Sequence, residues 1–145
     1  MGIVRESLRF ERKKDAHSAM GIGRRSQIER WLEETGIDGW TINNDMTIDI
    51  KGHLYLMYTD LSGFPDFIQF GKIDGNFFIN GNELVSLKGC PYIIGGSFDC
   101  SYNKLTNLEY FPISIEGNLY CYNNRIKFTQ DEILAICDVK REISN

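Results

Sequence analysis

The fold is decided by two stretches, IGGSFDCSYNKL at residues 94–105 and IEGNLYCYNNRI at residues 115–126, which are copies of one pattern. Two further copies align with them without gaps: IKGHLYLMYTDL at residues 50–61 and IDGNFFINGNEL at residues 73–84. The shared pattern is I-x-G-x-[LF]-x-[LIC]-x-x-[TN]-x-[LI], and successive copies start 23, 21 and 21 residues apart. Repetition at this period is typical of solenoids, in which each copy forms one coil of a stack.

Each shared position of the pattern has a physical reason. Two apolar positions lie two residues apart, so both side chains face one side of a strand: Leu54/Leu56, Phe77/Ile79, Phe98/Cys100 and Leu119/Cys121. The pattern then closes with one more predicted core residue: Leu61, Leu84, Leu105 and Ile126. A glycine precedes each strand, where we expect a positive φ or close backbone approach: Gly52, Gly75, Gly96 and Gly117.

A polar position also recurs, and it predicts hydrogen bonds between side chains and the backbone of neighbouring coils. It is occupied by Thr59, Asn82, Asn103 and Asn124. The alternative is chance alternation in an ordinary antiparallel sheet, which four gapless copies disfavour. We therefore predict an α/β solenoid, a short leucine-rich-repeat-like stack of about four coils whose strands are parallel and follow chain order.

The flanking segments predict structures that seal the ends of the stack. Ser26-Gln27-Ile28-Glu29 is a capping box that predicts the start of a helix, with Gly36 at its end. Residues 40–43 and 46–50 flank Asn44-Asp45 and predict a β-hairpin. At the other end, Thr129-Gln130-Asp131-Glu132 predicts a second helix. Its inward residues would be Ile133, Leu134, Ile136 and Cys137. The resulting organisation is a leader at 1–24, an N-terminal cap at 25–49, a solenoid at 50–128 and a helical C-terminal cap at 129–145.

The units LVSLKGCPYIIGGSFDCSYNK and LTNLEYFPISIEGNLYCYNNR resemble the repeats of leucine-rich-repeat-like proteins of tailed bacteriophages. The likeness extends to GIGRRSQIERWLEETGI and to the hairpin TINNDMTIDI, so it covers nearly the whole chain. The leader, MGIVRESLRFER, is similar to short basic leaders that direct proteins into phage heads. The resemblance implies a phage origin and a location in the host bacterial cytoplasm or in the virion, but that family has no uniform activity.

Charge and composition narrow the function. Residues 1–25 carry seven Lys and Arg against three Asp and Glu, and residues 26–145 carry nine against seventeen, which gives +4 and −8 and sums to the net charge of −4. An acidic body disfavours nucleic acid as a partner, and no apolar run is long enough to predict a membrane segment. The leader, with Gly21 and Gly23 as a joint, is expected to be flexible.

The reactive side chains predict no catalysis. The two histidines, His17 and His53, lack a recurring acidic partner, so we expect no enzyme activity. The four cysteines contain no CxxC pair, and we expect free buried thiols with no metal and no cofactor.

The side chains between the buried ones should point to an open face, and that face is the predicted protein-binding surface. Its candidate residues are Tyr55, Tyr58, Phe78, Asp99, Tyr102, Tyr120 and Tyr122. Exposed aromatic residues are typical of binding hot spots, and the alternative is that they only stack across strands. We expect a non-catalytic module that binds a host or virion protein, with a homo-oligomer possible. The alternatives are a structural or packaged virion component addressed by the leader, and a counter-defence inhibitor of a host enzyme.

Overall fold

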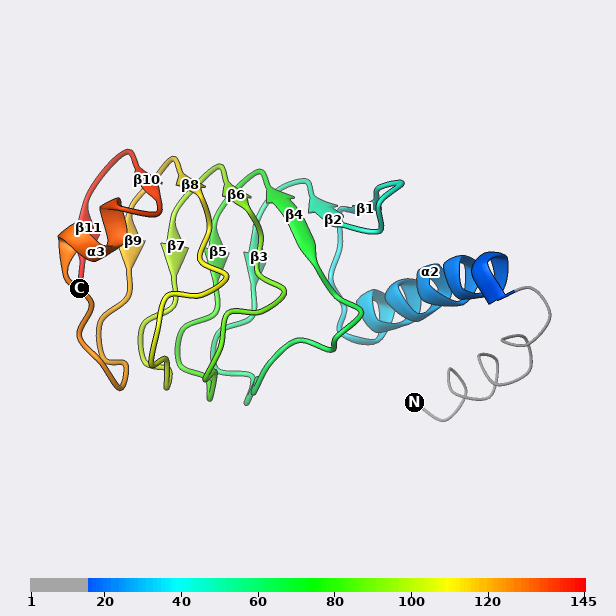
Figure 1. The fold of residues 1–145 in the computed structure, drawn as a ribbon, viewed down its shortest axis with the longest axis horizontal. Helices are drawn as coiled ribbons and strands as arrows, with labels where there is room; N and C mark the ends of the chain where they lie inside the picture. Colours follow the sequence, from blue (N-terminus) through cyan, green and yellow to red (C-terminus); the bar gives the residue numbers. More distant parts are fainter. Residues whose placement is uncertain (1–15) are drawn as a thin grey trace.

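The computed structural model, which describes residues 16–145, is a parallel β-solenoid of about five turns (Figure 1). Each coil contributes one strand to each of two sheets. The six-stranded sheet has the order β1 (Trp40–Ile42), β2 (Ile48–Ile50), β4 (Phe70–Ile73), β6 (Ile93–Ile94), β8 (Ser114–Ile115) and β10 (Asp138–Val139). The five-stranded sheet contains β3 (Leu54–Tyr55), β5 (Phe77–Phe78), β7 (Phe98–Asp99), β9 (Leu119–Tyr120) and β11 (Ile143–Ser144).

The predicted stack of parallel strands is the five-stranded sheet. Leu54, Phe77, Phe98 and Leu119 are register partners from coil to coil, as the gapless alignment requires. The six-stranded sheet was not predicted. It contains the isoleucine that opens each copy, and Ile50, Ile73, Ile94 and Ile115 are likewise register partners along it.

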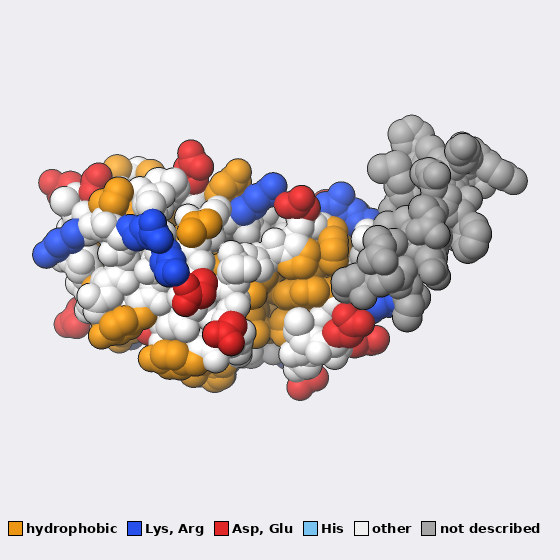
Figure 2. Space-filling model, turned by 90° about the horizontal axis from the view of Figure 1, so that it is seen from below, with side chains coloured by type: hydrophobic (Ala, Val, Ile, Leu, Met, Phe, Trp, Pro, Cys, Tyr) orange, Lys and Arg blue, Asp and Glu red, His pale blue; other side chains and the backbone are white. Residues whose placement is uncertain are grey.

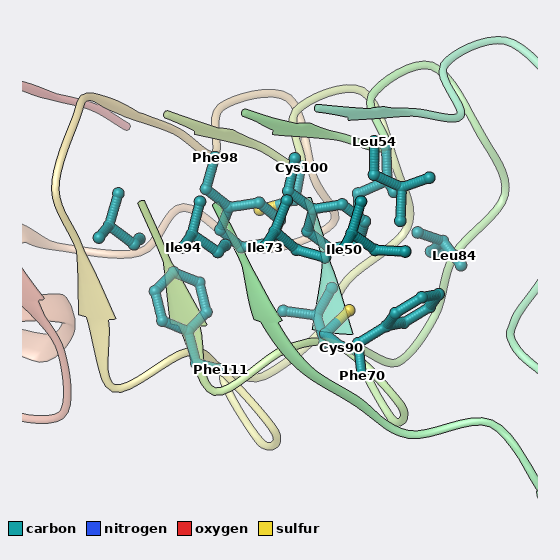
Figure 3. Packing of buried hydrophobic residues seen from close by; sticks show 14 of the residues in the cluster. Ile50, Leu54, Phe70, Ile73, Leu84, Cys90, Ile94, Phe98, Cys100 and Phe111 are labelled. Atoms are coloured by element: carbon teal, nitrogen blue, oxygen red, sulfur yellow. The ribbon is translucent and has the colours of Figure 1, made fainter. Parts of the chain in front are cut away.

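The core lies between the two sheets and is built from these ladders (Figure 3). The isoleucines of one sheet face the apolar pairs of the other, and Phe77 stacks on Phe98 with ring centroids 5.4 Å apart. Cys100 and Cys121 occupy one register, are buried and are not linked, which confirms the prediction of free buried thiols. Ile126, predicted to close the core of the fourth coil, is instead 48% exposed, because no further copy of the asparagine turn follows it.

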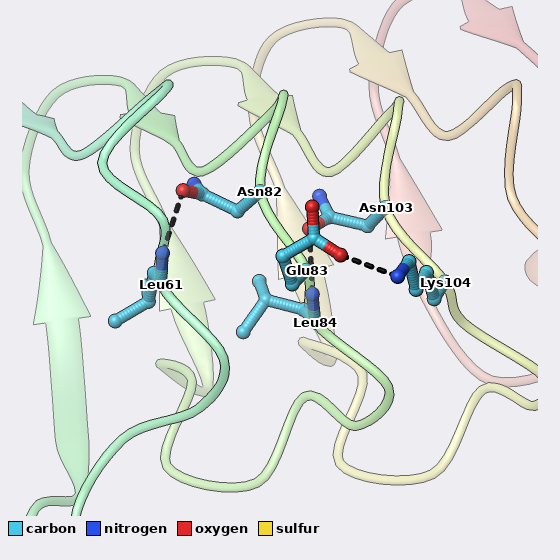
Figure 4. A network of polar contacts seen from close by, with 6 residues as sticks. All are labelled: Leu61, Asn82, Glu83, Leu84, Asn103 and Lys104. Carbon is cyan, nitrogen blue, oxygen red and sulfur yellow. Dashed lines mark hydrogen bonds and ion pairs between the residues drawn. The ribbon is translucent and has the colours of Figure 1, made fainter.

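The asparagine ladder forms as predicted (Figure 4). Asn103 Oδ1 accepts the Leu84 N–H at 3.0 Å, and Asn103 Nδ2 donates to the carbonyl oxygens of Ile79 and Cys100. Asn82 and Asn124 make the same kind of bonds to the preceding coil. The ladder therefore satisfies backbone groups that the turn leaves without partners.

A second polar ladder runs just after the glycines. The side chains of His53, Asn76, Ser97 and Asn118 each accept a backbone N–H from the following coil, at 2.8 to 3.0 Å. The glycines themselves pack backbone against backbone, as expected. A Cβ on Gly96 would lie 2.8 Å from the carbonyl carbon of Gly75, and Gly52 has a φ of +100°.

The N-terminal helix, α2 (Ala16–Glu34), begins well before the predicted capping box at Ser26. Gly21 and Gly23 lie inside it rather than forming a joint, because a helical glycine costs only about 1 kcal/mol relative to alanine. The boundary predicted at residue 24 therefore falls within the helix. The helix ends before Gly36, whose φ is +74°, and the predicted hairpin is formed by β1 and β2. The prediction for residues 1–15 lies outside the described residues.

The C-terminal segment is only partly helical. The capping box at Thr129 is present, but α3 spans only Gln130–Leu134, and β10 and β11 follow it and add a fifth coil. Of the four residues predicted to face inward, Ile133 and Cys137 are buried, whereas Leu134 and Ile136 are exposed. The helix is too short to turn both of the latter toward the core.

Candidate protein-binding surface

The outward face of the five-stranded sheet brings together four of the predicted residues. Tyr55, Phe78, Asp99 and Tyr120 are register partners on β3, β5, β7 and β9. The rings of Tyr55 and Phe78 lie 5.1 Å apart, and His53 stacks on Tyr55 at 5.3 Å. Phe78, Asp99 and Tyr120 are only partly exposed. Cross-strand stacking therefore accounts for part of this ladder, as the alternative interpretation expected.

Polar contacts fix the remaining members of the ladder. Asp99 interrupts the aromatic run, and its Oδ1 accepts the Ser101 N–H at 3.0 Å and the Ser101 hydroxyl at 2.5 Å. The carboxylate is thus held by its own turn. The Asn118 amide donates to the Tyr120 hydroxyl at 3.1 Å. Both side chains are positioned before any partner arrives.

The most exposed aromatic residues lie at the turn that follows this sheet. Tyr58 is 72% exposed and Tyr102 is 53% exposed, and their φ angles are +56° and +55°. The same register is occupied by Gly81 (φ +70°) and Asn123 (φ +56°) in the other coils. Glycine and asparagine adopt this left-handed conformation readily, whereas a tyrosine pays roughly 1–2 kcal/mol for it. The turn therefore holds two exposed tyrosines at an energetic cost.

These turn tyrosines pack sideways and leave much of their rings open. Tyr102 and Tyr122 meet edge to face, with centroids 5.6 Å apart and an interplanar angle of 81°. The Tyr58 ring lies where a side chain on Gly81 would be. Tyr58, Tyr102 and Tyr122, which we call the turn tyrosines, thus form a pre-positioned aromatic edge along the stack.

A further set of exposed apolar residues was missed because the six-stranded sheet was not predicted. Its exposed members are Val85, Tyr92, Ile93, Tyr110 and Ile113. Tyr110 has a φ of +65° and occupies the register that Gly89 holds one coil earlier. That substitution of tyrosine for a turn glycine was the available sequence signal. Seen from below, hydrophobic side chains form separate patches between charged ones (Figure 2).

Reactive groups in the described part of the chain are buried or isolated. Desolvation raises the pKa of Cys121 to about 11 and that of Cys137 to about 12, and it raises the pKa of Cys90 and Cys100 as well. No group of three or more His, Cys, Asp or Glu side chains within residues 16–145 is placed to hold a metal ion. None of the helices described combines the length and apolar character that crossing a membrane requires.

Comparisons with protein-family models, with characterised proteins and with solved structures give no match for this chain. The architecture and the surface chemistry of the solenoid are therefore the basis for its function.

Proposed function

We propose that this chain is a non-catalytic protein–protein interaction module built on a leucine-rich-repeat-like solenoid. The observation that carries the proposal is the left-handed backbone at Tyr58 and Tyr102, whose rings are largely exposed. Backbone strain of this kind persists only where the surrounding structure maintains it, and it clusters at functional positions. Tyrosine supplies a large, rigid contact area to a partner, which is why it is enriched in binding hot spots.

The chemistry of the surface favours a macromolecular partner. The aromatic edge is exposed to solvent, whereas small-molecule sites are concave and enclose most of their ligand. Five strands roughly 4.8 Å apart give the open face only about 300 Å², well below the ~800 Å² per partner of a standard interface. The partner must therefore also contact the turns or the ends of the stack. The resemblance to phage proteins suggests a host or virion protein for this role.

The test separates binding from stability by replacing Tyr58 and Tyr102, the two turn tyrosines with a positive φ, with glycine, the residue found at the same register at position 81. The double variant Tyr58→Gly/Tyr102→Gly relieves strain, so its melting temperature should be unchanged or higher. Its affinity for the partner should fall by roughly 30-fold or more, since even one hot-spot residue contributes ~2 kcal/mol or more. Partners would be captured from host-cell extract on the wild-type protein and then measured in purified form by calorimetry.

Tyr110→Gly is the matched control. Tyr110 is as exposed as Tyr102 and also has a positive φ, but it lies in the connection that leads to the six-stranded sheet. It should gain or keep stability and should retain partner binding. If both variants bind the partner as well as the wild type does, the turn tyrosines are not the binding surface.

A further inference from the structure

The core of the solenoid is covered at one end of the stack and only partly covered at the other. At the N-terminal end, the first members of the two apolar ladders, Ile50 and Leu54, are 1% and 4% exposed. At the opposite end, where β10 and β11 are the outermost strands, the last members are Val139 and Ile143 (Figure 1). Both pack against the core but are only partly buried, because no further coil among the described residues lies over them. This end therefore leaves two core positions open.

A groove of about 330 Å³ lies at this end of the stack. It is lined by Gln130, Leu134, Val139, Arg141, Glu142 and Ile143. Leu134 comes from α3 and is 51% exposed, so apolar side chains from α3, β10 and β11 line one opening. A partner that fills the groove would cover the open end of the core.

The backbone at this end is also open. In β10, the N–H groups of Asp138 and Lys140 donate to the neighbouring coil at 2.9 and 3.0 Å, and in β11 the carbonyl groups of residues 142 and 144 accept from it. Because backbone groups alternate in direction along a strand, those of Val139 and Ile143 face away from the stack. Neither of these N–H groups takes part in a backbone hydrogen bond between described residues. Both sheets thus end in an exposed edge.

The charges favour a second copy of the chain at this end and disfavour it elsewhere. Residues 26–124 carry five Lys and Arg against thirteen Asp and Glu, so they hold the whole net charge of −8 of the acidic body. Residues 125–145, which form the last coil, carry four of each sign and are neutral. Two copies that meet through their acidic coils repel each other, whereas two copies that meet through their last coils do not.

The two free charges in the groove are complementary to themselves. Arg141 and Glu142 are adjacent and exposed, and neither forms an ion pair within residues 16–145. Lys140 and Asp138, by contrast, already neutralise each other at 2.6 Å. In a contact with two-fold symmetry the same patch faces itself, so Arg141 of one copy meets Glu142 of the other, twice. The groove therefore has the alternation of charge that a symmetric contact requires.

We propose that two copies of this chain associate end to end through the last coil, with Leu134, Val139 and Ile143 at the centre of a two-fold contact. The association goes beyond the proposed function and does not involve Tyr58 or Tyr102. It would bring the turn tyrosines of two copies into one particle, which strengthens binding to a partner that has repeated sites.

The end of the stack is large enough for a reversible dimer. Half of a 21-residue coil is about 33 Å long at ~3.3 Å per residue, and two sheets ~10 Å apart with their outer side chains are about 20 Å thick. The end therefore offers on the order of 600 Å² per copy, close to the ~800 Å² per partner of a standard interface. This is about twice the area of the open face of the five-stranded sheet.

The test measures the mass of the full-length protein by sedimentation equilibrium from about 1 μM to 1 mM, where a monomer should convert to a dimer and to nothing larger. Leu134→Lys places two like charges at the two-fold contact and should weaken the dimer by at least about tenfold. Ile113→Lys is the matched control, because Ile113 is similarly exposed but lies next to β8, in the six-stranded sheet, and does not line the groove. It makes the same change of charge and should leave the dimer unchanged.

A charge exchange tests the symmetry of the contact. Arg141→Glu and Glu142→Arg should each weaken the dimer, and the double variant Arg141→Glu/Glu142→Arg should restore it, because each copy then again meets opposite charges. The double variant Tyr58→Gly/Tyr102→Gly should dimerise normally, so a failure of the proposed binding surface is distinguishable from a failure of this inference. The inference is overturned if the protein stays monomeric up to 1 mM, if the assemblies grow beyond a dimer, if Ile113→Lys weakens association as much as Leu134→Lys, or if the double charge exchange does not restore the dimer.

Discussion

Asn103 is the residue whose loss the structure allows to be estimated most directly. Its side chain is almost fully buried, and its Oδ1 accepts the Leu84 N–H, for which the described residues show no other acceptor. The carbonyl oxygens of Ile79 and Cys100 each keep a second donor, from Asn82 and Asn124 respectively. Asn103 Nδ2 also donates to the Ser101 carbonyl oxygen, which keeps the Gly81 N–H as a second donor. Asn103→Ala therefore leaves one buried N–H without a partner and weakens three shared acceptors.

The magnitude follows from those four groups. A buried unsatisfied donor costs about 1–3 kcal/mol and each shared bond about 0.5 kcal/mol, so the free energy of unfolding should fall by roughly 2.5–4.5 kcal/mol. That is a large share of the ~5–15 kcal/mol typical of a domain. Urea denaturation followed by circular dichroism would measure it, with an unchanged m-value showing that the same surface unfolds.

Asn124→Ala is the matched comparison. Asn124 accepts the Leu105 N–H at 3.0 Å and donates to Cys100 and Cys121 in the same geometry, but its bonds are only partly buried. Water can replace them in the variant, so the loss should be about 1 kcal/mol. The reasoning is refuted if Asn103→Ala costs less than about 1 kcal/mol, or if Asn124→Ala costs as much as Asn103→Ala.

Two further predictions concern the glycines and the thiols. Gly96→Ala should destabilise the protein by about 1–3 kcal/mol, because its Cβ meets the Gly75 backbone, whereas Gly36→Ala meets no atom and should cost only the ~1–2 kcal/mol of a positive φ. A larger loss of stability in urea for Gly36→Ala than for Gly96→Ala would contradict this. The melting temperature should fall as pH rises from 9 to 11, because unfolded thiols ionise near their ordinary pKa of 9.0 and lose protons that the folded Cys121 retains. Calorimetry of Cys121→Ala should show a shallower fall than the wild type, and an identical pH profile would contradict the assignment.

The sequence predicted the elements whose residues repeat and missed those whose residues vary. The five-stranded sheet was predicted because its apolar pairs alternate in every copy. The six-stranded sheet has one repeated apolar position, and its outward neighbours are as different as Lys72, Ile93 and Ser114. The fifth coil was missed because Arg141 stands where the other copies have glycine. Periodicity therefore identifies strands only where the packing demands similar side chains.

The candidate surface was predicted in composition but not in conformation. All seven predicted residues lie on the five-stranded sheet or at its turn, yet the left-handed backbone of Tyr58 and Tyr102 contradicts the preference of tyrosine. The neighbouring Gly81 and Asn123 carry the signal, since both favour that conformation. Helix α3 ends early, which exposes Leu134 and Ile136. Its end depends on the strands that follow it, and no residue in the helix itself predicts that end.

The two polar ladders make this molecule extensible in whole units. The side chain after each glycine accepts a backbone N–H from the following coil, and each asparagine accepts a backbone N–H from the preceding coil. Every internal junction between coils therefore uses the same two kinds of hydrogen bond. Deleting residues 94–114 would place the ladder side chains of the second coil next to those of the fourth in correct register, because that span is one 21-residue unit. Removing one residue fewer would turn every later side chain to the wrong face. Such a protein can change length by whole coils, and the spacing between its exposed tyrosines can then change only in steps of one strand separation, about 4.8 Å.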